Sequence, residues 1–274
     1  MSDNQNDENK TIQDKKPKGC FTCRGCVVIA VLLIVVAIVY VAPAVKDSRE
    51  EAMRMACVNN MKQLALALNN YHSNYGTYPP AYTTDADGNP LHSWRVLLLP
   101  YMYQDRLYES LRLDEPWDSP HNSHFHDQMP RVYVYCCTRR PKEEREKGLT
   151  PYQMVIGPDT ISNGPNCTKL SDVSSDKGDT LLFVESSVSV PWMKPEDLPQ
   201  SALYNGVVSS IPLRGQPIEQ GIGSPHYTYY KMAHPLAPRI TGANAAMDDI
   251  SCIFLTKDTP PKDLLEKSRI RKPE

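Results

Sequence analysis

The sequence lacks an excess of charge of either sign, and this absence argues against one class of function, the binding of nucleic acids. Thirty Lys and Arg residues stand against 32 Asp and Glu residues, which gives a formal net charge of −2 over 274 residues. A near-neutral chain has no overall basic field to hold a nucleic-acid backbone. We therefore expect no nucleic-acid partner.

Motifs typical of enzymes are also missing. The nucleophile elbow G-x-S-x-G, the phosphate-binding G-x-x-x-x-G-K-[ST], the zinc-protease H-E-x-x-H and the dinucleotide-binding G-x-G-x-x-G do not occur. Glu185, on an apolar stretch, is a lone carboxylate without an evident acid/base partner in the sequence. We expect a non-catalytic protein without a cofactor.

Glycine is scarce relative to proline, with 13 residues against 24. This balance predicts many turns, irregular connections and few long helices. Apolar residues make up 41% and charged residues 23% of the chain, which is the composition of a globular protein that can bury a core.

What the chain does have is one long apolar run. Residues 27–45 carry no charge, and as a helix they extend roughly 28 Å, close to the ~30 Å hydrocarbon thickness of a bilayer. The run predicts one transmembrane helix. The alternative is a signal peptide cleaved after Ala42-Pro43-Ala44, but the long polar leader and the length of the run argue against it. Basic residues on the two sides favour a cytoplasmic N-terminus only weakly.

The run divides the chain into three parts. Residues 1–26 are predicted to form a disordered cytoplasmic tail that ends in the spacing C-x-x-C-x-x-C next to the membrane. Three cysteines fall short of a closed four-ligand metal site, so we interpret them as small boundary residues. Residues 27–45 form the transmembrane helix, and residues 46–274 have the size of one domain.

After the apolar run, the apolar positions follow the surface of a helix. They recur at steps of three and four over residues 53–75, which places them on one helical face. Gly76 ends the pattern, and Pro79 prevents its resumption. One helix over residues 27–75, bent near Pro43, is the prediction. The stripe consists of Met53, Cys57, Met61, Leu64, Leu68, Tyr71 and Tyr75.

Short β-branched or aromatic runs predict the surface on which this stripe packs. The last two of them read as a hairpin joined by Asp248 and Asp249, a poorer turn than Asp-Gly because positive φ is costly without glycine. We expect an α+β fold with a long N-terminal helix packed on an antiparallel sheet with irregular loops. The predicted strands are residues 131–135, 152–156, 180–184, 245–247 and 250–255.

Five blocks of the sequence carry a resemblance to a known family. They are CVNNMKQLALALNNYHSNYGTYPP at 57–80, SWRVLLLP at 93–100, PWDSPHN at 116–122, VPWMKPEDL at 190–198 and GAN at 242–244. Together they resemble the large planctomycete family of prepilin-like proteins of unknown function, over most of residues 19–265. The resemblance implies a type IV pilin-like N-terminal helix, an extracytoplasmic α+β domain and a cytoplasmic N-terminus, but no reaction.

The processing site that this family commonly carries is degenerate here. Family members have a glycine before Phe-Thr and a glutamate as the fifth mature residue. In this chain Cys20 precedes Phe21, and Gly25 stands at the glutamate position. Both departures oppose cleavage and polymerisation, because the peptidase reads the small residue and the glutamate neutralises a neighbour's N-terminus in lipid. We expect an uncleaved, single-pass anchor.

Five cysteines follow the span and would lie outside the cytoplasm, where disulfides can persist. Cys57 is on the predicted stripe, and Cys136 and Cys137 end a predicted strand, so a bridge from Cys57 to one of these two is the preferred pairing. Cys167 with Cys252 is the second candidate. Connectivity cannot be deduced from spacing, and small buried thiols are the alternative throughout.

The densest group of metal-type side chains is Asp118, His121, His124 and His126. Imidazoles at steps of three and two can bind a divalent ion if the loop folds around it. The group belongs to a block that resembles the family, for which a structural loop is the simpler role. We therefore predict no metal site.

Two classes of function remain. The first is a pseudopilin-like structural protein whose partners are the membrane, further copies of itself or pilus-type and secretion-type machinery. The second is a tethered binding module for a solute, glycan or envelope polymer, which agrees with the solute-binding-type label of the resembling family. In both, the protein lies in the inner (cytoplasmic) membrane with its main domain in the periplasm.

Overall fold

A computed structural model describes most of the chain. The described residues are 24–131, 133–169, 179–208, 220–225, 227–229 and 239–270. Contacts divide the chain into two units, residues 1–45 and residues 46–274. Cys20 and Phe21 of the degenerate processing site lie outside the described residues, whereas Gly25 lies in the first helix.

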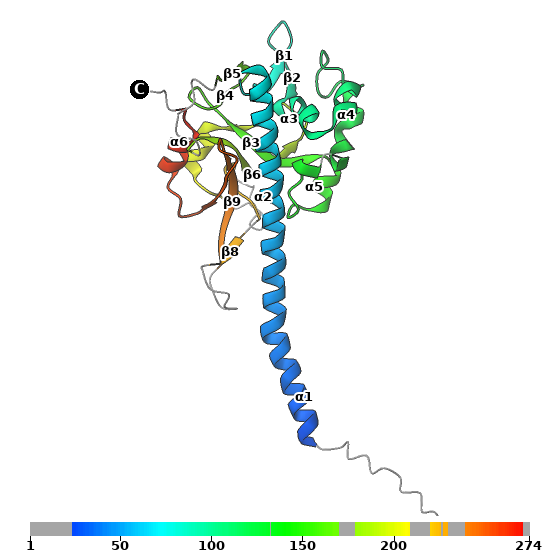
Figure 1. Cartoon of the computed structure of the whole chain (residues 1–274), viewed down its shortest axis with the longest axis vertical. Helices are drawn as coiled ribbons and strands as arrows, with labels where there is room; N and C mark the ends of the chain where they lie inside the picture. Colours follow the sequence, from blue (N-terminus) through cyan, green and yellow to red (C-terminus); the bar gives the residue numbers. More distant parts are fainter. Residues whose placement is uncertain are drawn as a thin grey trace, which may run out of the picture. The chain divides into compact units, whose positions relative to one another are not determined.

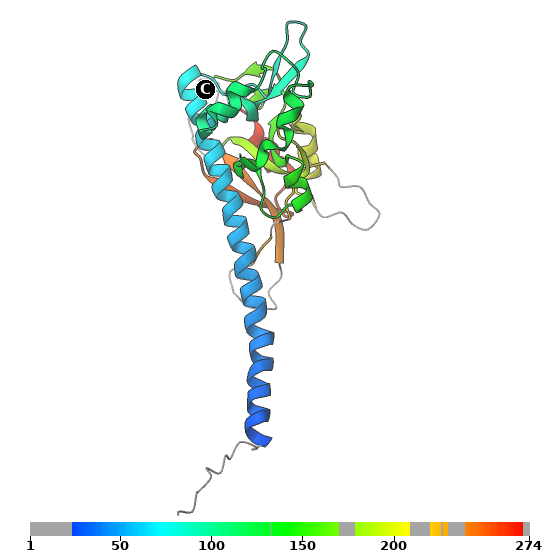
Figure 2. The same cartoon turned by 90° about the vertical axis from the view of Figure 1, so that its right-hand side faces the viewer.

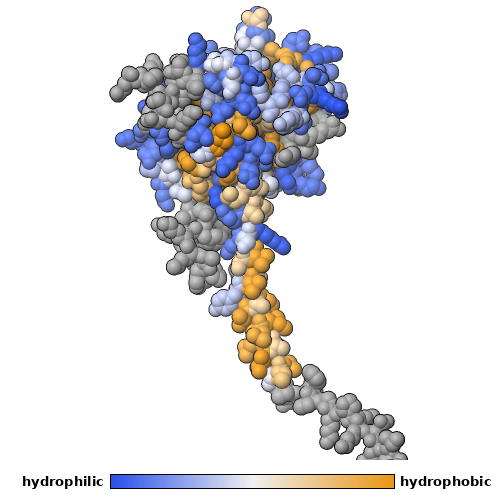
Figure 3. Space-filling model, in the orientation of Figure 1, coloured by the Kyte–Doolittle hydropathy of each residue, from blue (hydrophilic) through white to orange (hydrophobic). Residues whose placement is uncertain are grey.

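The described part of the first unit, from residue 24, is an apolar helix. It consists of α1 (Arg24–Val36), a π-helical turn η1 (Ala37–Val41) and the start of α2 (Ala42–Tyr75). Its large apolar side chains are about half exposed or more, and Figure 3 shows them as a continuous hydrophobic surface. Among the described residues, one helix, Gly25–Tyr75, is long and apolar enough to cross a membrane.

A π-helical turn precedes the proline at which the sequence predicts a bend. A proline at position 43 has no N–H to donate to the carbonyl of Val39, four residues earlier. Val39 lies inside η1, where the helical hydrogen-bond pattern shifts to the wider π form. The irregularity therefore begins at Ala37, six residues before Pro43.

The remainder of α2, from Lys46, belongs to the second unit. Cys57, Leu64 and Leu68 of the predicted stripe are fully buried, whereas Leu66, on another face of the same helix, is 49% exposed. The helix ends where Gly76 takes a φ of +72° and its N–H donates to the carbonyl of His72, 2.7 Å away. The prediction of an amphipathic helix is confirmed, although its last member, Tyr75, is exposed.

The stripe of α2 packs on a large mixed sheet, as Figures 1 and 2 show. The strand order is β10-β9-β6-β3-β4-β5, with β7 beside β3 and β8 beside β9. Most neighbours are antiparallel, as predicted, but β4 and β7 run parallel to β3. The strands are β3 (Leu149–Ile156), β4 (Ser162–Asn163), β5 (Asn166–Cys167), β6 (Leu181–Pro191), β7 (Leu198–Pro199), β8 (Tyr227–Tyr229), β9 (Arg239–Met247) and β10 (Cys252–Thr256).

Each face of the sheet has its own hydrophobic core. Leu182 and Phe183 face α2, whereas Leu181 and Val184 belong to the opposite core. A register shift between Leu181 and Phe183 explains why two adjacent residues share one face. Strand alternation after Val184 then returns Glu185 to the side of α2.

Short elements complete the unit, in keeping with the richness in proline. A two-stranded sheet pairs β1 with β2, and η6 and α6 contact each other. These elements are β1 (Tyr82–Thr84), β2 (Pro90–Ser93), α3 (Trp94–Leu97), η2 (Leu99–Met102), α4 (Asp105–Ser110), η3 (Asn122–Arg131), η4 (Tyr133–Tyr135), α5 (Lys142–Glu146), η6 (Gln200–Asn205) and α6 (Pro261–Ser268).

Two local predictions need correction. Residues 131–135 were expected as a strand, but η3 ends at Arg131 and Tyr133–Tyr135 form a 3-10 turn. Val134 and Tyr135 are both buried in the core next to α2, a pattern that strand alternation does not allow. In the confirmed β9–β10 hairpin, the positive φ of +70° falls on Ile250 and not on an aspartate.

Candidate functional site

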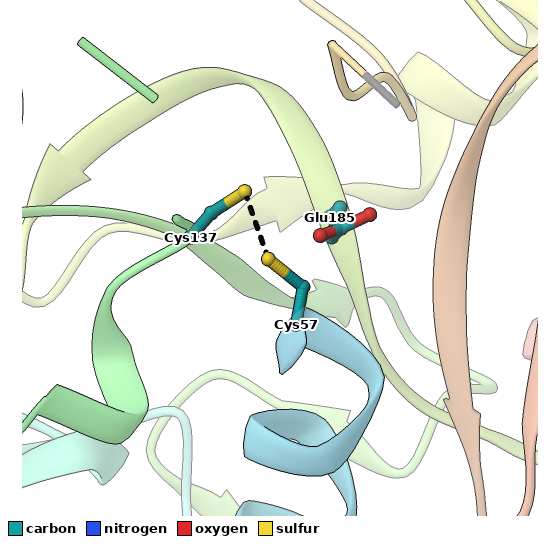
Figure 4. Close-up of side chains that lie close together, drawn as sticks. All are labelled: Cys57, Cys137 and Glu185. Carbon is teal, nitrogen blue, oxygen red and sulfur yellow. Dashed lines mark hydrogen bonds between the residues drawn. The ribbon is translucent and has the colours of Figure 1, made fainter. Parts of the chain in front are cut away.

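Three chemically active side chains meet in the core beneath α2. Cys57 projects from α2, Cys137 follows η4, and Glu185 lies on β6 (Figure 4). The two sulfur atoms are 3.2 Å apart, and the ligand atoms of all three residues lie within 4.8 Å of one another. All three side chains are completely or almost completely buried.

The segment that carries Cys137 is held against α2 on both sides of Cys57. The side-chain amide of Asn60 donates to the carbonyl of Cys136 over 3.0 Å. The hydroxyl of Thr138 donates to the carbonyl of Met53 over 3.2 Å and lies 3.6 Å from the Cys57 sulfur. Because these contacts come from residues four before and three after Cys57, they fix the turn of the helix that faces Cys137.

The carboxylate of Glu185 is held by the neighbouring strand. Its Oε2 accepts from the backbone N–H of Asn244 over 2.8 Å and from the Asn244 side-chain amide over 2.9 Å. From the sequence alone, Glu185 is a carboxylate without an evident partner. The structure instead gives it a donor on β9 and places it beside two thiols.

Burial has the largest effect on the protonation of Cys137. It raises the pKa of Cys137 well above the ordinary value, and the hydrogen bond with Cys57 and the charge of Glu185 act in the same direction. Burial, followed by the influence of the two cysteines and Glu185, also raises the pKa of Tyr152. A thiol that stays protonated at neutral pH is a weak nucleophile. Cys137 is therefore poorly suited to nucleophilic catalysis, and two chemistries that remove the thiol proton, cross-linking and metal ligation, remain for the cluster.

Both of these chemistries fit the donor set. Two thiols at this separation need a shift of about 1 Å to reach the ~2.05 Å of a disulfide. The two cysteines and the glutamate are also ligand types that Zn²⁺ accepts, although structural zinc sites use four ligands. Among the described residues, this is the one set of at least three metal-type side chains whose ligand atoms lie close together.

The histidine group has other contacts. His121 Nε2 lies 2.9 Å from the carbonyl oxygen of Ser110, and His126 Nε2 lies 2.9 Å from that of Trp117, on whose ring it also stacks. His124 and Asp118 are exposed, and the two carbonyl contacts place the other two imidazoles on different parts of the loop. The described loop therefore uses His121 and His126, both partly exposed, to hold backbone turns.

The remaining predicted cysteines are spread over the second unit. Burial raises the pKa of Cys136 and of Cys252 to about 11 each. Cys167 is exposed on β5, at the opposite end of the strand order from Cys252 on β10. The second candidate pairing, Cys167 with Cys252, is therefore not brought together by the fold. The preferred pairing is brought together for Cys137 rather than for Cys136.

A cavity of about 550 Å³ lies next to the cluster. It is bounded by α2, residues 136–138 and α5. Its lining includes Asn60, Cys136, Lys142 and Arg145. Sequence reasoning did not foresee it, because its walls come from segments about eighty residues apart.

A buried ion pair was also missed. Arg95 Nη2 donates to Asp197 Oδ1 over 2.6 Å, and both side chains are fully buried. The same oxygen accepts from the indole of Trp94 over 3.0 Å and from the backbone N–H of Met154 over 2.8 Å. Desolvation outweighs the attraction of Arg95 and these hydrogen bonds, and it raises the pKa of Asp197 to about 6. The one sequence feature that pointed to this pair is that Arg95 and Asp197 both lie in blocks that resemble the family.

Comparison with known proteins gives one family. A model of the family described as "Protein of unknown function (DUF1559)" matches residues 46–197. No curated protein and no solved structure matches the chain. The matched segment begins where the second unit begins and contains all three members of the buried cluster as well as the ion pair.

Proposed function

The chain belongs to the DUF1559 family of proteins of unknown function, and we propose that it is a membrane-anchored, pilin-like protein with a structural or interaction role outside the cytoplasm. In this proposal the first unit spans the inner membrane once, with its N-terminus in the cytoplasm. The second unit faces the periplasm and is not an enzyme.

The observation that carries the proposal is the solvent-facing apolar helix of the first unit. From Val27 to Val41 every large apolar side chain is 48% to 64% exposed, although such residues are normally buried. At about 25 cal/mol per Å², so large an apolar surface is unstable in water and stable in lipid. A helix of this length and composition satisfies its backbone internally, as a membrane span requires.

The N-terminal sequence suits a pilin-like membrane anchor better than a subunit that polymerises into a filament. Gly25, in α1, stands where the resembling family commonly has the glutamate that pairs with a neighbour's N-terminus. Without that carboxylate, a helix in lipid has no charged partner to offer an adjacent copy. We therefore favour an anchored protein that contacts other envelope components over a subunit of a long filament.

A second candidate function is a tethered binding module. The cavity of about 550 Å³ between α2 and α5 has the size of a small-molecule site, and its walls are mostly apolar with a few charged groups. One of these, Lys142, is paired over 3.1 Å with Glu146, one turn further along the same helix α5. A solute or a short segment of an envelope polymer would suit such a cavity.

Membrane extraction tests the anchor. Replacement of Leu33 and Val36 together by arginine places two charges in the span, at a cost of about 2.5–3.5 kcal/mol each near the centre. We expect the wild-type chain and the matched Leu33→Ala/Val36→Ala variant to stay with membranes in alkaline carbonate. The arginine variant should leave the membrane fraction. Release of the wild type would contradict the proposal.

Chemical cross-linking in native membranes separates the two candidate functions. A ladder of regularly spaced multiples of the chain would favour assembly with further copies. A monomer that is cross-linked only to other envelope proteins would favour a non-polymerising interaction protein. A solitary monomer whose cavity residues become protected by an added solute would favour the binding module.

A further inference from the structure

We propose that Cys57 and Cys137 form a disulfide bond that fastens α2 to the segment following η4. The inference deepens the proposed function and rests on its outward orientation, because disulfides persist in the periplasm and not in the cytoplasm. Beyond the earlier expectation, the geometry selects Cys137 over Cys136 and specifies what the bond joins.

The sulfur positions carry the first step. The two Sγ atoms lie 3.2 Å apart, and both side chains are buried. Small changes in the side-chain torsion angles of the two cysteines can cover the remaining ~1 Å to bonding distance. The hydrogen bonds from Asn60 and Thr138 hold the two segments together while the sulfurs approach each other.

The other cysteines of the second unit are poorer partners. Cys136 lines the neighbouring cavity and is partly exposed, whereas Cys57 and Cys137 are both buried. The Cys252 sulfur lies near the carbonyl of Val58, 3.9 Å away. Cys167 is exposed on the β5 edge of the sheet. Cys137 is therefore the partner that the fold presents to Cys57.

The chemistry is a thiol–disulfide exchange. The sulfurs of Cys57 and Cys137 form one S–S bond, and an external disulfide, such as that of an oxidoreductase or of oxidised glutathione, is broken. The two protons and two electrons of the cysteine thiols end on the two thiols of the reduced oxidant. Because both sulfurs are buried in the finished fold, the exchange takes place while the chain folds, before α2 is fully covered.

The position of the bond suggests its role. It joins residues that are 80 positions apart, and it lies on the helix that continues from the apolar segment. Pulling or tilting of α2 would otherwise be resisted by non-covalent contacts, such as side-chain packing and the hydrogen bonds of Asn60 and Thr138. A covalent link at Cys57 prevents the helix from peeling off the sheet when the anchor and the domain are loaded in opposite directions.

Peptide mapping of the full-length protein tests the bond. Cells are quenched in acid, free thiols are blocked with N-ethylmaleimide, and the protein is digested with trypsin without reductant. We expect peptide 55–62, which contains Cys57, to be linked to peptide 132–139 and to be released by reduction. Because peptide 132–139 contains both Cys136 and Cys137, the variants Cys136→Ser and Cys137→Ser are needed. The link should persist in the first and disappear in the second.

A second arm separates the bond from the orientation on which it depends. Full-length protein in detergent is unfolded, reduced and refolded in a glutathione redox buffer, and the same peptides are measured. A bond that forms there but is absent from cells supports the geometry and contradicts the outward-facing domain. Failure to form it there overturns the inference, as does linkage through Cys136. Retention of one zinc ion per chain with both thiols unoxidised also overturns it.

Discussion

Removal of the carboxylate at the centre of the second unit should be among the most damaging single changes. In Asp197→Ala the guanidinium of Arg95 stays fully buried without its counter-charge, and the indole of Trp94 and the N–H of Met154 lose their acceptor. Breaking a buried pair from one side costs about 3–5 kcal/mol. That is a large share of the roughly 5–15 kcal/mol that stabilises a typical domain. We expect a loss of this size in the free energy of unfolding.

Two further variants show whether charge or hydrogen bonding is responsible. Asp197→Asn keeps an oxygen that can accept from Trp94 and Met154 but removes the charge, so its loss should be smaller than that of the alanine variant. Arg95→Met combined with Asp197→Leu replaces both charges by apolar groups, and such replacements are often neutral or stabilising. The double variant should therefore be more stable than Asp197→Ala, even though it contains two substitutions.

Urea unfolding of the full-length protein in detergent, followed by tryptophan fluorescence, measures these differences. Trp94 reports on the site directly, because its indole N–H donates to Asp197. If Asp197→Ala unfolded within about 1 kcal/mol of the wild type, the reasoning about an uncompensated buried charge would be refuted. If the alanine variant yields no folded protein, the order of the Asn and double variants still decides the question.

Three further predictions concern pH, thiol reactivity and packing. The pKa of Asp197 is raised to about 6, above its unfolded value of about 3.9, so the folded state binds more protons between these two pH values. The free energy of unfolding should therefore fall as pH rises from about 4 to about 6. In Asp197→Asn this pH dependence should be lost. Cys136, with a pKa raised to about 11, should react with iodoacetamide at pH 8 far more slowly than exposed Cys167, and equal rates would contradict its burial. Leu64→Ala should cost about 2–5 kcal/mol and Leu66→Ala at most about 0.5 kcal/mol, because only the first side chain is fully buried; equal losses in urea unfolding would refute the assigned helix face.

The sequence was most informative where a repeating pattern met a clear end signal. Steps of three and four identified the buried face of α2, and Gly76 ended the helix as predicted. Two short apolar runs joined through Asp248 and Asp249 identified the β9–β10 hairpin. These features depend on local periodicity and turn chemistry, which a sequence displays directly.

Features that depend on distant contacts could not be predicted in the same way. Residues 131–135 have the composition of a strand, but Val134 and Tyr135 pack into the core from the 3-10 turn Tyr133–Tyr135. The meeting of Cys57, Cys137 and Glu185 depends on how α2, η4 and β6 are stacked. The buried pair of Arg95 and Asp197 contradicts the rule that charged side chains stay at the surface, so only tertiary structure reveals it.

The most direct test of the proposed function asks which side of the membrane the second unit occupies. Cys26 in the first unit and Cys167 in the second are both exposed. In spheroplasts treated with a membrane-impermeant maleimide, we expect Cys167 to be labelled without lysis, Cys167→Ser to lose that label, and Cys26 to react only after lysis. Labelling of Cys167 only after lysis would place the domain in the cytoplasm and contradict the proposed function.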